Sequence, residues 1–134
     1  MIPRYRAWNK ATKEMHEVDD IVSIDFGKSE ICVKTLFFGK FSYYDLDDIV
    51  FMQSTGLTDK NGKEIFEGDI LRVTNLSSWL EVVSFNEDKA MFISKEIKRE
   101  VEETPLYDLF NTDIFEIETI GNIYTNPELA EVSS

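Results

Sequence analysis

The sequence is poor in the residues from which metal sites, disulfides and membrane spans are built. It has one cysteine and one histidine in 134 residues. A structural zinc site usually takes four Cys or His ligands and a disulfide takes two cysteines, so a single chain supplies neither. The longest apolar runs, such as 49–52, fall far short of the roughly 18 residues of a membrane span. No apolar stretch follows the basic N-terminal residues, so we predict no signal peptide and a cytoplasmic protein.

Basic residues are also in short supply. The chain has 14 Lys and Arg against 26 Asp and Glu, a net charge of −12. Non-specific binding to nucleic acid or to an anionic membrane needs cations that neutralise phosphates, so we expect neither partner. Residues 100–134 hold nine acids and no Lys or Arg, whereas residues 1–13 hold four basic residues and no acid. This asymmetry favours packing within the fold, self-association, or an acidic surface that competes with nucleic acid for a basic partner.

Apolar residues make up 43% of the chain and aromatic residues 13%, which is enough to build a core and argues against disorder. No internal repeat and no linker rich in Pro, Gly or Ser interrupts the chain. We therefore predict a single domain over residues 1–134. Ten Phe, five Tyr and two Trp are more aromatics than a core of this size easily buries. Because aromatics are enriched at interfaces, they favour a homo-oligomer.

Short alternating segments bounded by turn residues predict a mainly β fold. The predicted strands are 5–8, 21–26, 30–38, 41–44, 49–54, 70–73, 79–85, 89–93 and 115–119. Asn61-Gly62 predicts a hairpin over Thr58–Glu64 through a type I′ turn, with positive φ at both residues. This many short strands implies a small β-barrel or sandwich-like domain. The segment 67–73 is typical of SH3-like barrels.

Helical content is predicted to be one or two short helices. In the clearer helix, Thr104 is the expected cap and Pro105 the first helical residue. Leu106, Leu109 and Phe110 then fall at the spacing of one helix face. A second, weaker pattern covers 94–103.

Cys32 and His16 are the only candidates for nucleophilic chemistry of the Cys–His type. Cys32 lies between Ile31 and Val33, which predicts a buried, inert thiol. His16 lies in the polar run Lys-Glu-Met-His-Glu, which predicts a solvated side chain. No neighbouring residue supports a catalytic pair.

Acidic clusters at Asp19-Asp20, Asp45 and Asp47-Asp48 could in principle hold Mg²⁺ for phosphoryl chemistry. On so acidic a chain, neighbouring loop aspartates are more typical of solvated turns. The segment Asp59–Glu64 superficially resembles a calcium loop. Its glycine is fourth rather than sixth, however, which favours the hairpin turn.

Tyr43, Tyr44, Trp8 and Trp79 could stack on nucleic-acid bases. Stacking platforms need a basic groove around them, so we expect core or interface packing instead. The sequence therefore predicts no catalytic residue, no cofactor-binding residue, no metal ligand and no cofactor.

Three blocks of sequence together resemble one family of proteins. They are Arg4–Lys10 with Met15, then Met52–Ile70, then Ile120–Leu129. In this order they are similar to the YopX family of phage and prophage proteins. The resemblance implies a mostly β protein, encoded by a virus or prophage and acting in the host cytoplasm. It implies no catalytic residue set.

Three functional hypotheses follow. The first is a non-enzymatic accessory protein that binds proteins or assembles with itself. The second is an acidic mimic that occupies the nucleic-acid site of a host protein. The third is a metal-dependent enzyme built on the aspartate clusters. A host or phage protein is a further partner under the first hypothesis.

Overall fold

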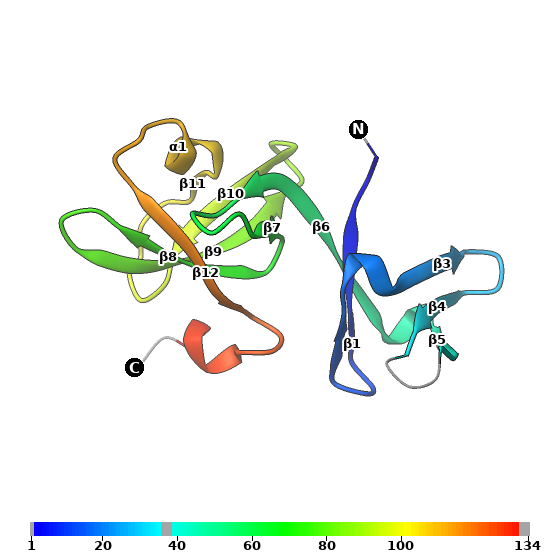
Figure 1. Cartoon of the computed structure of the whole chain (residues 1–134). Helices are drawn as coiled ribbons and strands as arrows, with labels where there is room; N and C mark the ends of the chain where they lie inside the picture. The colour runs from blue at the N-terminus through cyan, green and yellow to red at the C-terminus, as the bar shows by residue number, and fades with distance from the viewer. Residues whose placement is uncertain (1, 36–38, 132–134) are drawn as a thin grey trace. The chain divides into compact units, whose positions relative to one another are not determined.

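The computed structural model describes residues 2–35 and 39–131 (Figure 1). They form two compact units, residues 1–53 and residues 54–134. The prediction of a mainly β fold with few short helices is confirmed. The boundary between the units falls inside a continuous strand, β6, which is why no linker composition marks it. The assignment of the whole chain to one domain stays a prediction.

The 1–53 unit contains two groups of antiparallel strands. In the first, β1 pairs with β2 on one side and with the start of β6 on the other. In the second, β3, β4 and β5 form a three-stranded sheet in that order. The strands are β1 (Tyr5–Asn9), β2 (Glu14–His16), β3 (Ile21–Asp25), β4 (Glu30–Lys34), β5 (Phe41–Asp45) and β6 (Ile49–Thr58). Their inward side chains, led by Ile31, Val33 and Ala7, form one buried cluster. Part of the predicted strand 30–38 lies outside the described residues.

The 54–134 unit is built on a five-stranded antiparallel sheet of order β11-β10-β9-β8-β12. Its strands are β8 (Asp69–Thr74), β9 (Ser78–Asn86), β10 (Met91–Glu96), β11 (Thr104–Pro105) and β12 (Glu116–Asn122), with β7 (Glu64–Phe66) paired to β6. Seven buried apolar residues form the core, which is centred on Leu71, Val73 and Val83. The predicted strands 79–85 and 89–93 correspond to β9 and β10, which pair as an antiparallel hairpin connected by residues 87–90.

The helices are shorter than the sequence predicts. The only α-helix among the described residues is α1 (Tyr107–Phe110), beside three short 3₁₀ helices at Val18–Asp20, Leu46–Asp48 and Pro127–Ala130. None has the length and apolar character that a membrane-spanning helix requires. Leu106 and Leu109, which the sequence places on one helix face, are both buried.

Two details of the helix prediction are wrong. Thr104 is not a cap, because Thr104 and Pro105 form β11 against the edge of β10, and Leu106 takes the cap position. The helix over 94–103 is also wrong, because Ser94–Glu96 continue β10 and pair with β9. Pairing on both sides of Ser94 outweighs the weak helical periodicity of this segment.

The strand β6 is longer than the predicted 49–54 and contains a bulge. Ser54 lies opposite Phe66 and Thr58 opposite Glu64, so three residues of β6 face one residue of β7. Gly56, at a φ of +79°, supplies the bend. The hydroxyl of Thr55 donates to the carbonyl oxygen of Ile65 at 2.8 Å and fixes the bulge to the partner strand.

The hairpin at Thr58–Glu64 is confirmed, but the type I′ turn is wrong. Gly62 has a φ of +79°, whereas Asn61 is not among the residues with positive φ. The carboxylate of Asp59 accepts a hydrogen bond from the Asn61 amide at 2.9 Å, which holds Asn61 in the ordinary right-handed region. The Gly62 amide donates to the Asp59 carbonyl at 3.0 Å. The loop is therefore a type I turn followed by a left-handed glycine.

We predict that Gly62→Ala lowers the free energy of unfolding by about 1 kcal/mol, the cost of a left-handed alanine. A Cβ at Gly62 would meet no atom within 4 Å, so steric clash does not contribute. The matched control is Gly62→Asn, which should lose less because asparagine tolerates the left-handed region. Urea unfolding measures both variants, and equal losses would contradict the backbone explanation.

Candidate functional site

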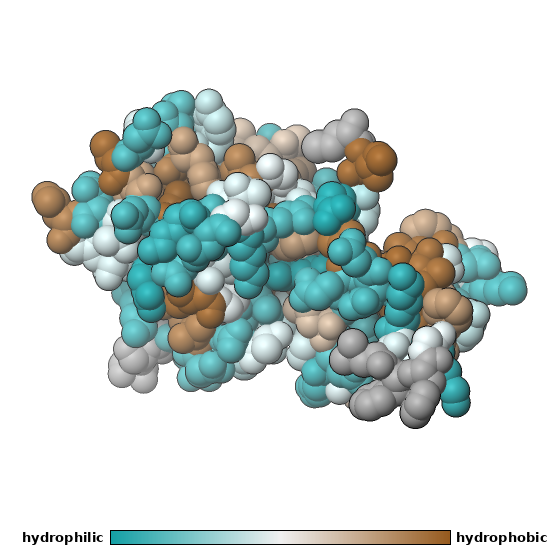
Figure 2. All heavy atoms as spheres, viewed as in Figure 1, coloured by the Kyte–Doolittle hydropathy of each residue, from teal (hydrophilic) through white to brown (hydrophobic). Residues whose placement is uncertain are grey.

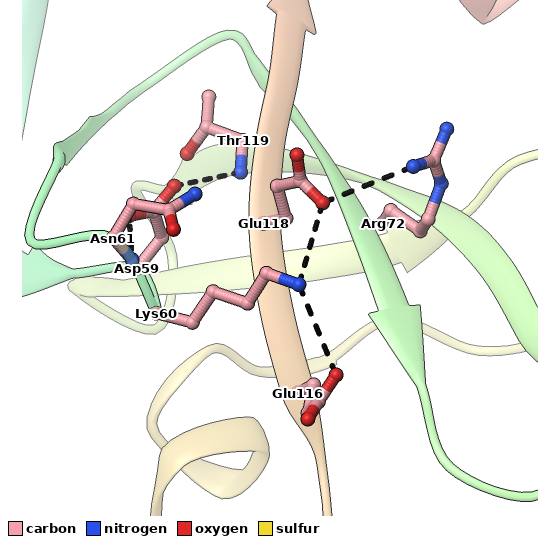
Figure 3. Close-up of polar contacts among 7 residues, drawn as sticks. All are labelled: Asp59, Lys60, Asn61, Arg72, Glu116, Glu118 and Thr119. Atoms are coloured by element: carbon pink, nitrogen blue, oxygen red, sulfur yellow. Dashed lines mark hydrogen bonds and ion pairs between the residues drawn. The ribbon is translucent and has the colours of Figure 1, made fainter.

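The turn Asp59–Lys63 lies against the edge strand β12 (Figure 3). One edge of β12 pairs with β8, and the turn supplies partners to the other edge. The Lys60 amide donates to the Ile117 carbonyl at 2.8 Å, and the Thr119 amide donates to Asp59 Oδ2 at 2.9 Å. The turn thus satisfies backbone groups that an edge strand would otherwise expose.

The carboxylate of Asp59 is the centre of this arrangement. It is only 7% exposed. It accepts hydrogen bonds at 2.9 Å from the backbone amides of Asn61, Lys63 and Thr119. Burial by itself would raise the pKa of Asp59, but the three amide donors outweigh burial and lower the pKa below its ordinary value. A carboxylate held in this way stays ionised and does not serve as a proton acceptor near neutral pH.

Charged side chains surround the turn on its solvent side. Lys60 Nζ lies 3.8 Å from a carboxylate oxygen of Glu116 and 3.6 Å from one of Glu118, and Arg72 lies 3.8 Å from the same Glu118 oxygen (Figure 3). These side chains are about one-third to three-quarters exposed. Each ion pair therefore contributes less than about 1 kcal/mol.

These ion pairs bear on the charge asymmetry of the sequence. Glu116 and Glu118 belong to the acid-rich segment 100–134. Glu103 belongs to the same segment, and its Oε1 lies 3.9 Å from Lys89 Nζ. The partners shown for these three acids all come from the 54–134 unit. Part of the acidic C-terminal segment is thus balanced by basic residues of its own unit.

An open pocket of about 270 Å³ lies beside the turn. Phe110 and Phe115 contribute apolar surface, while Lys60, Asp113 and Glu116 contribute charge. Lys60 already pairs with Glu116, and Asp59, which also lines the pocket, is saturated by backbone donors. The pocket presents a mixed surface that suits weak binding and contains no activated acid or base.

The predicted acidic clusters lie on two 3₁₀ turns. Asp19 and Asp20 belong to Val18–Asp20, and Asp47 and Asp48 to Leu46–Asp48. Asp45 caps the second turn, because its Oδ1 accepts from the Asp47 amide at 2.9 Å. Within 2–35 and 39–131, no three His, Cys, Asp or Glu side chains are grouped to hold a metal ion. The role that the structure gives Asp45 is local capping.

Cys32 is buried, as predicted, but the prediction for His16 is wrong. His16 is only 7% exposed and stacks on Tyr44 with ring centroids 5.6 Å apart. The reason is β2, a strand of three residues that pairs with β1 and places His16 opposite Ala7. The residues around His16 are mostly polar, so the sequence shows no strand pattern there. His16 Nε2 has no hydrogen-bond partner within the described part of the chain.

The four aromatic candidates separate into two groups. Trp8 is buried, Tyr44 packs on the core of the 1–53 unit, and Trp79 packs on the core of the 54–134 unit. The Trp79 indole donates to Glu81 at 2.8 Å. Core packing is therefore confirmed for three of them. Tyr43 is the exception, with 62% of its surface exposed. A hydrogen bond with the Cys32 thiol is the main cause that raises the pKa of the Tyr43 hydroxyl.

Tyr43 and Tyr44 differ in exposure although the same packing is predicted for both from the sequence. The signal was available, because successive residues of a strand face opposite sides of the sheet. A buried pair that is not predicted from the sequence is formed by Ser94, which donates to Glu81 at 2.7 Å. No local sequence pattern predicts this pair, because Glu81 lies on β9 and Ser94 on β10.

We predict that Asp59→Asn lowers the free energy of unfolding at neutral pH by about 2 kcal/mol, because the charged acceptor of three amides is lost. Because the folded-state pKa of Asp59 is lowered, its stabilising contribution is complete above about pH 5. It is lost as the pH falls through the folded-state value. The difference in unfolding free energy between wild type and Asp59→Asn should therefore shrink as the pH falls from about 5 to about 2.

The control for this variant is Asp113→Asn, which removes the same charge from an exposed residue of the same pocket. It should leave the stability within about 0.5 kcal/mol of wild type. Urea titrations at several pH values measure both variants. A difference in unfolding free energy between wild type and Asp59→Asn that stays constant with pH would contradict the stabilising role of the ionised carboxylate.

Comparison with known proteins gives two solved structures that cover nearly the whole chain. One is a crystal structure of the protein EF1440 from Enterococcus faecalis, with a TM-score of 0.62 and 28% identity over 98% of this chain and 99% of that one. The other is protein yopX from Bacillus subtilis, with a TM-score of 0.65 and 24% identity over 96% and 98%. No curated protein matches. The family described as YopX protein matches residues 4–131. The chain therefore belongs to the YopX family.

Proposed function

We propose that this protein is a non-enzymatic accessory module that acts through protein–protein contact and associates with itself. The resemblance to the YopX family supports a phage or prophage origin and action in the host cytoplasm. The observation that carries the proposal is an exposed aromatic surface on the 1–53 unit.

This surface lies on the three-stranded sheet β3-β4-β5. Phe41 is 53% exposed and Tyr43 is 62% exposed, and both come from β5. Figure 2 shows hydrophobic residues at the surface over this part of the molecule, at the right of the view. Large aromatics left in water on one face are typical of a surface that another protein covers.

The distribution of charge supports the same surface. The 1–53 unit has seven basic and nine acidic residues, a net charge of −2. The 54–134 unit has seven basic and seventeen acidic residues, a net charge of −10. Repulsion between copies is therefore weakest at the unit that carries the exposed aromatics.

We predict that light scattering shows a mass rising from 15.6 kDa towards twice that value as the concentration increases. Tyr43→Ser should shift this transition to at least about tenfold higher concentration, because an exposed aromatic anchor is lost. The matched control is Tyr107→Ser, since Tyr107 on α1 is equally exposed at 62%. A mass that stays at that of one chain up to 500 µM would overturn the proposal.

The charge of the 54–134 unit favours a second function, an acidic mimic of nucleic acid that binds a basic host protein. Ten surplus negative charges on a small unit produce the field that attracts a nucleic-acid-binding surface. The exposed acids include Glu100, Glu102, Asp108, Asp113 and Glu128.

For the mimic, we predict that host proteins captured on the immobilised chain elute between about 50 and 500 mM salt, because screening weakens exposed charge pairs. Added duplex DNA should displace the same proteins. Capture that survives high salt and excess DNA would contradict mimicry and would favour apolar contact.

A further inference from the structure

The outer face of the three-stranded sheet has a defined chemical order. Ile31 and Val33 of β4 are buried in the core of the 1–53 unit. Because side chains alternate along a strand, Glu30, Cys32 and Lys34 point to the opposite face. Glu30 and Lys34 stand at the two ends of this row, with Cys32 between them.

The neighbouring strand β5 adds the aromatics to the same face. Tyr43 lies opposite Cys32, and Phe41 lies opposite Lys34. Tyr44 packs on the core, so its neighbour Tyr43 points outward. Asp25 of β3 and Asp45 of β5 both lie opposite Glu30. The face therefore has an apolar centre over Cys32, three acids at one end and Lys34 at the other.

We propose that this face binds the same face of a second copy, with the two β4 strands antiparallel, so that Glu30 of each copy pairs with Lys34 of the other. The inference rests on the proposed self-association and adds the surface and the geometry to it. Two copies related by a two-fold axis meet through identical patches.

Charge decides between the two ways of stacking identical faces. With the β4 strands antiparallel, each Glu30 meets a Lys34 and both pairs form at once. With the strands parallel, Glu30 would meet Glu30 and Lys34 would meet Lys34, and like charges in register are destabilising. Only the antiparallel arrangement places the aromatic centres together and opposite charges at both ends.

The size of the face sets the expected affinity of self-association. Three strands of five residues span roughly 15 Å in each direction, well below the ~800 Å² per partner of a standard interface. The association should therefore be weak, with a dissociation constant on the order of 100 µM. Sedimentation equilibrium of the full chain from 10 to 500 µM covers this range.

A charge swap tests the geometry. Glu30→Lys and Lys34→Glu should each weaken self-association roughly tenfold, because each turns two attractive contacts per dimer into repulsive ones. The double variant, with both changes, should return to within about threefold of wild type. The controls are Glu17→Lys and Lys10→Glu, which make the same charge changes at exposed residues elsewhere in the 1–53 unit.

Each outcome decides a different point. Restoration by the double variant, with unchanged circular dichroism for all variants, supports the antiparallel pair. Weakening by both single variants without restoration overturns it. If the charge swap has no effect while Tyr43→Ser still weakens association, this geometry is overturned and the proposed function stands. A single-chain mass at every concentration overturns both.

Discussion

Three backbone amides converge on the carboxylate of Asp59, and the 54–134 unit depends on this contact. One of the amides belongs to Thr119, sixty residues further along the chain. The bond joins the β6–β7 hairpin to β12, whose outer edge would otherwise face solvent with unpaired backbone groups. The same turn that reverses the chain therefore also closes the sheet edge. Asp59 therefore has a structural role in this turn.

The other polar groups that could suggest catalysis have structural roles as well. Asp45 caps a 3₁₀ turn, Glu81 accepts from Trp79 and Ser94, and Lys60 pairs with acids of β12. What the fold leaves available is surface. The 1–53 unit has exposed aromatic residues and a net charge of −2, whereas the 54–134 unit has a net charge of −10.

Much of the fold could be predicted from the sequence, because alternation and turn residues report local geometry. The strands at 21–26, 49–54, 79–85 and 115–119 are present, with changed ends. The failures have a common cause, since each depends on a particular hydrogen-bonded partner that alternation and turn residues do not report. β2 exists because β1 pairs with it, and β10 extends through Ser94 because β9 supplies its partner. The turn at Asn61-Gly62 differs from type I′ because Asp59 fixes Asn61.

The candidate surface was predictable only in part. Composition indicates an excess of aromatics, but not which of them the core leaves out. Tyr43 and Tyr44 are chemically identical neighbours, and only the direction of β5 relative to the core separates the ring that packs on the core from the exposed one. The pairing of Tyr43 with Cys32, and of Phe41 with Lys34, requires the register of the sheet.

The bulge in β6 has a consequence for how such a chain can change length during evolution. In a regular strand, inserting or deleting one residue turns every later side chain to the opposite face. In β6, residues 55–57 lie opposite the single residue Ile65, so the segments before and after them are already uncoupled in register. A length change at this point would alter the bulge alone. Each unit could then diverge at its own pace while the strand that runs through both remained intact.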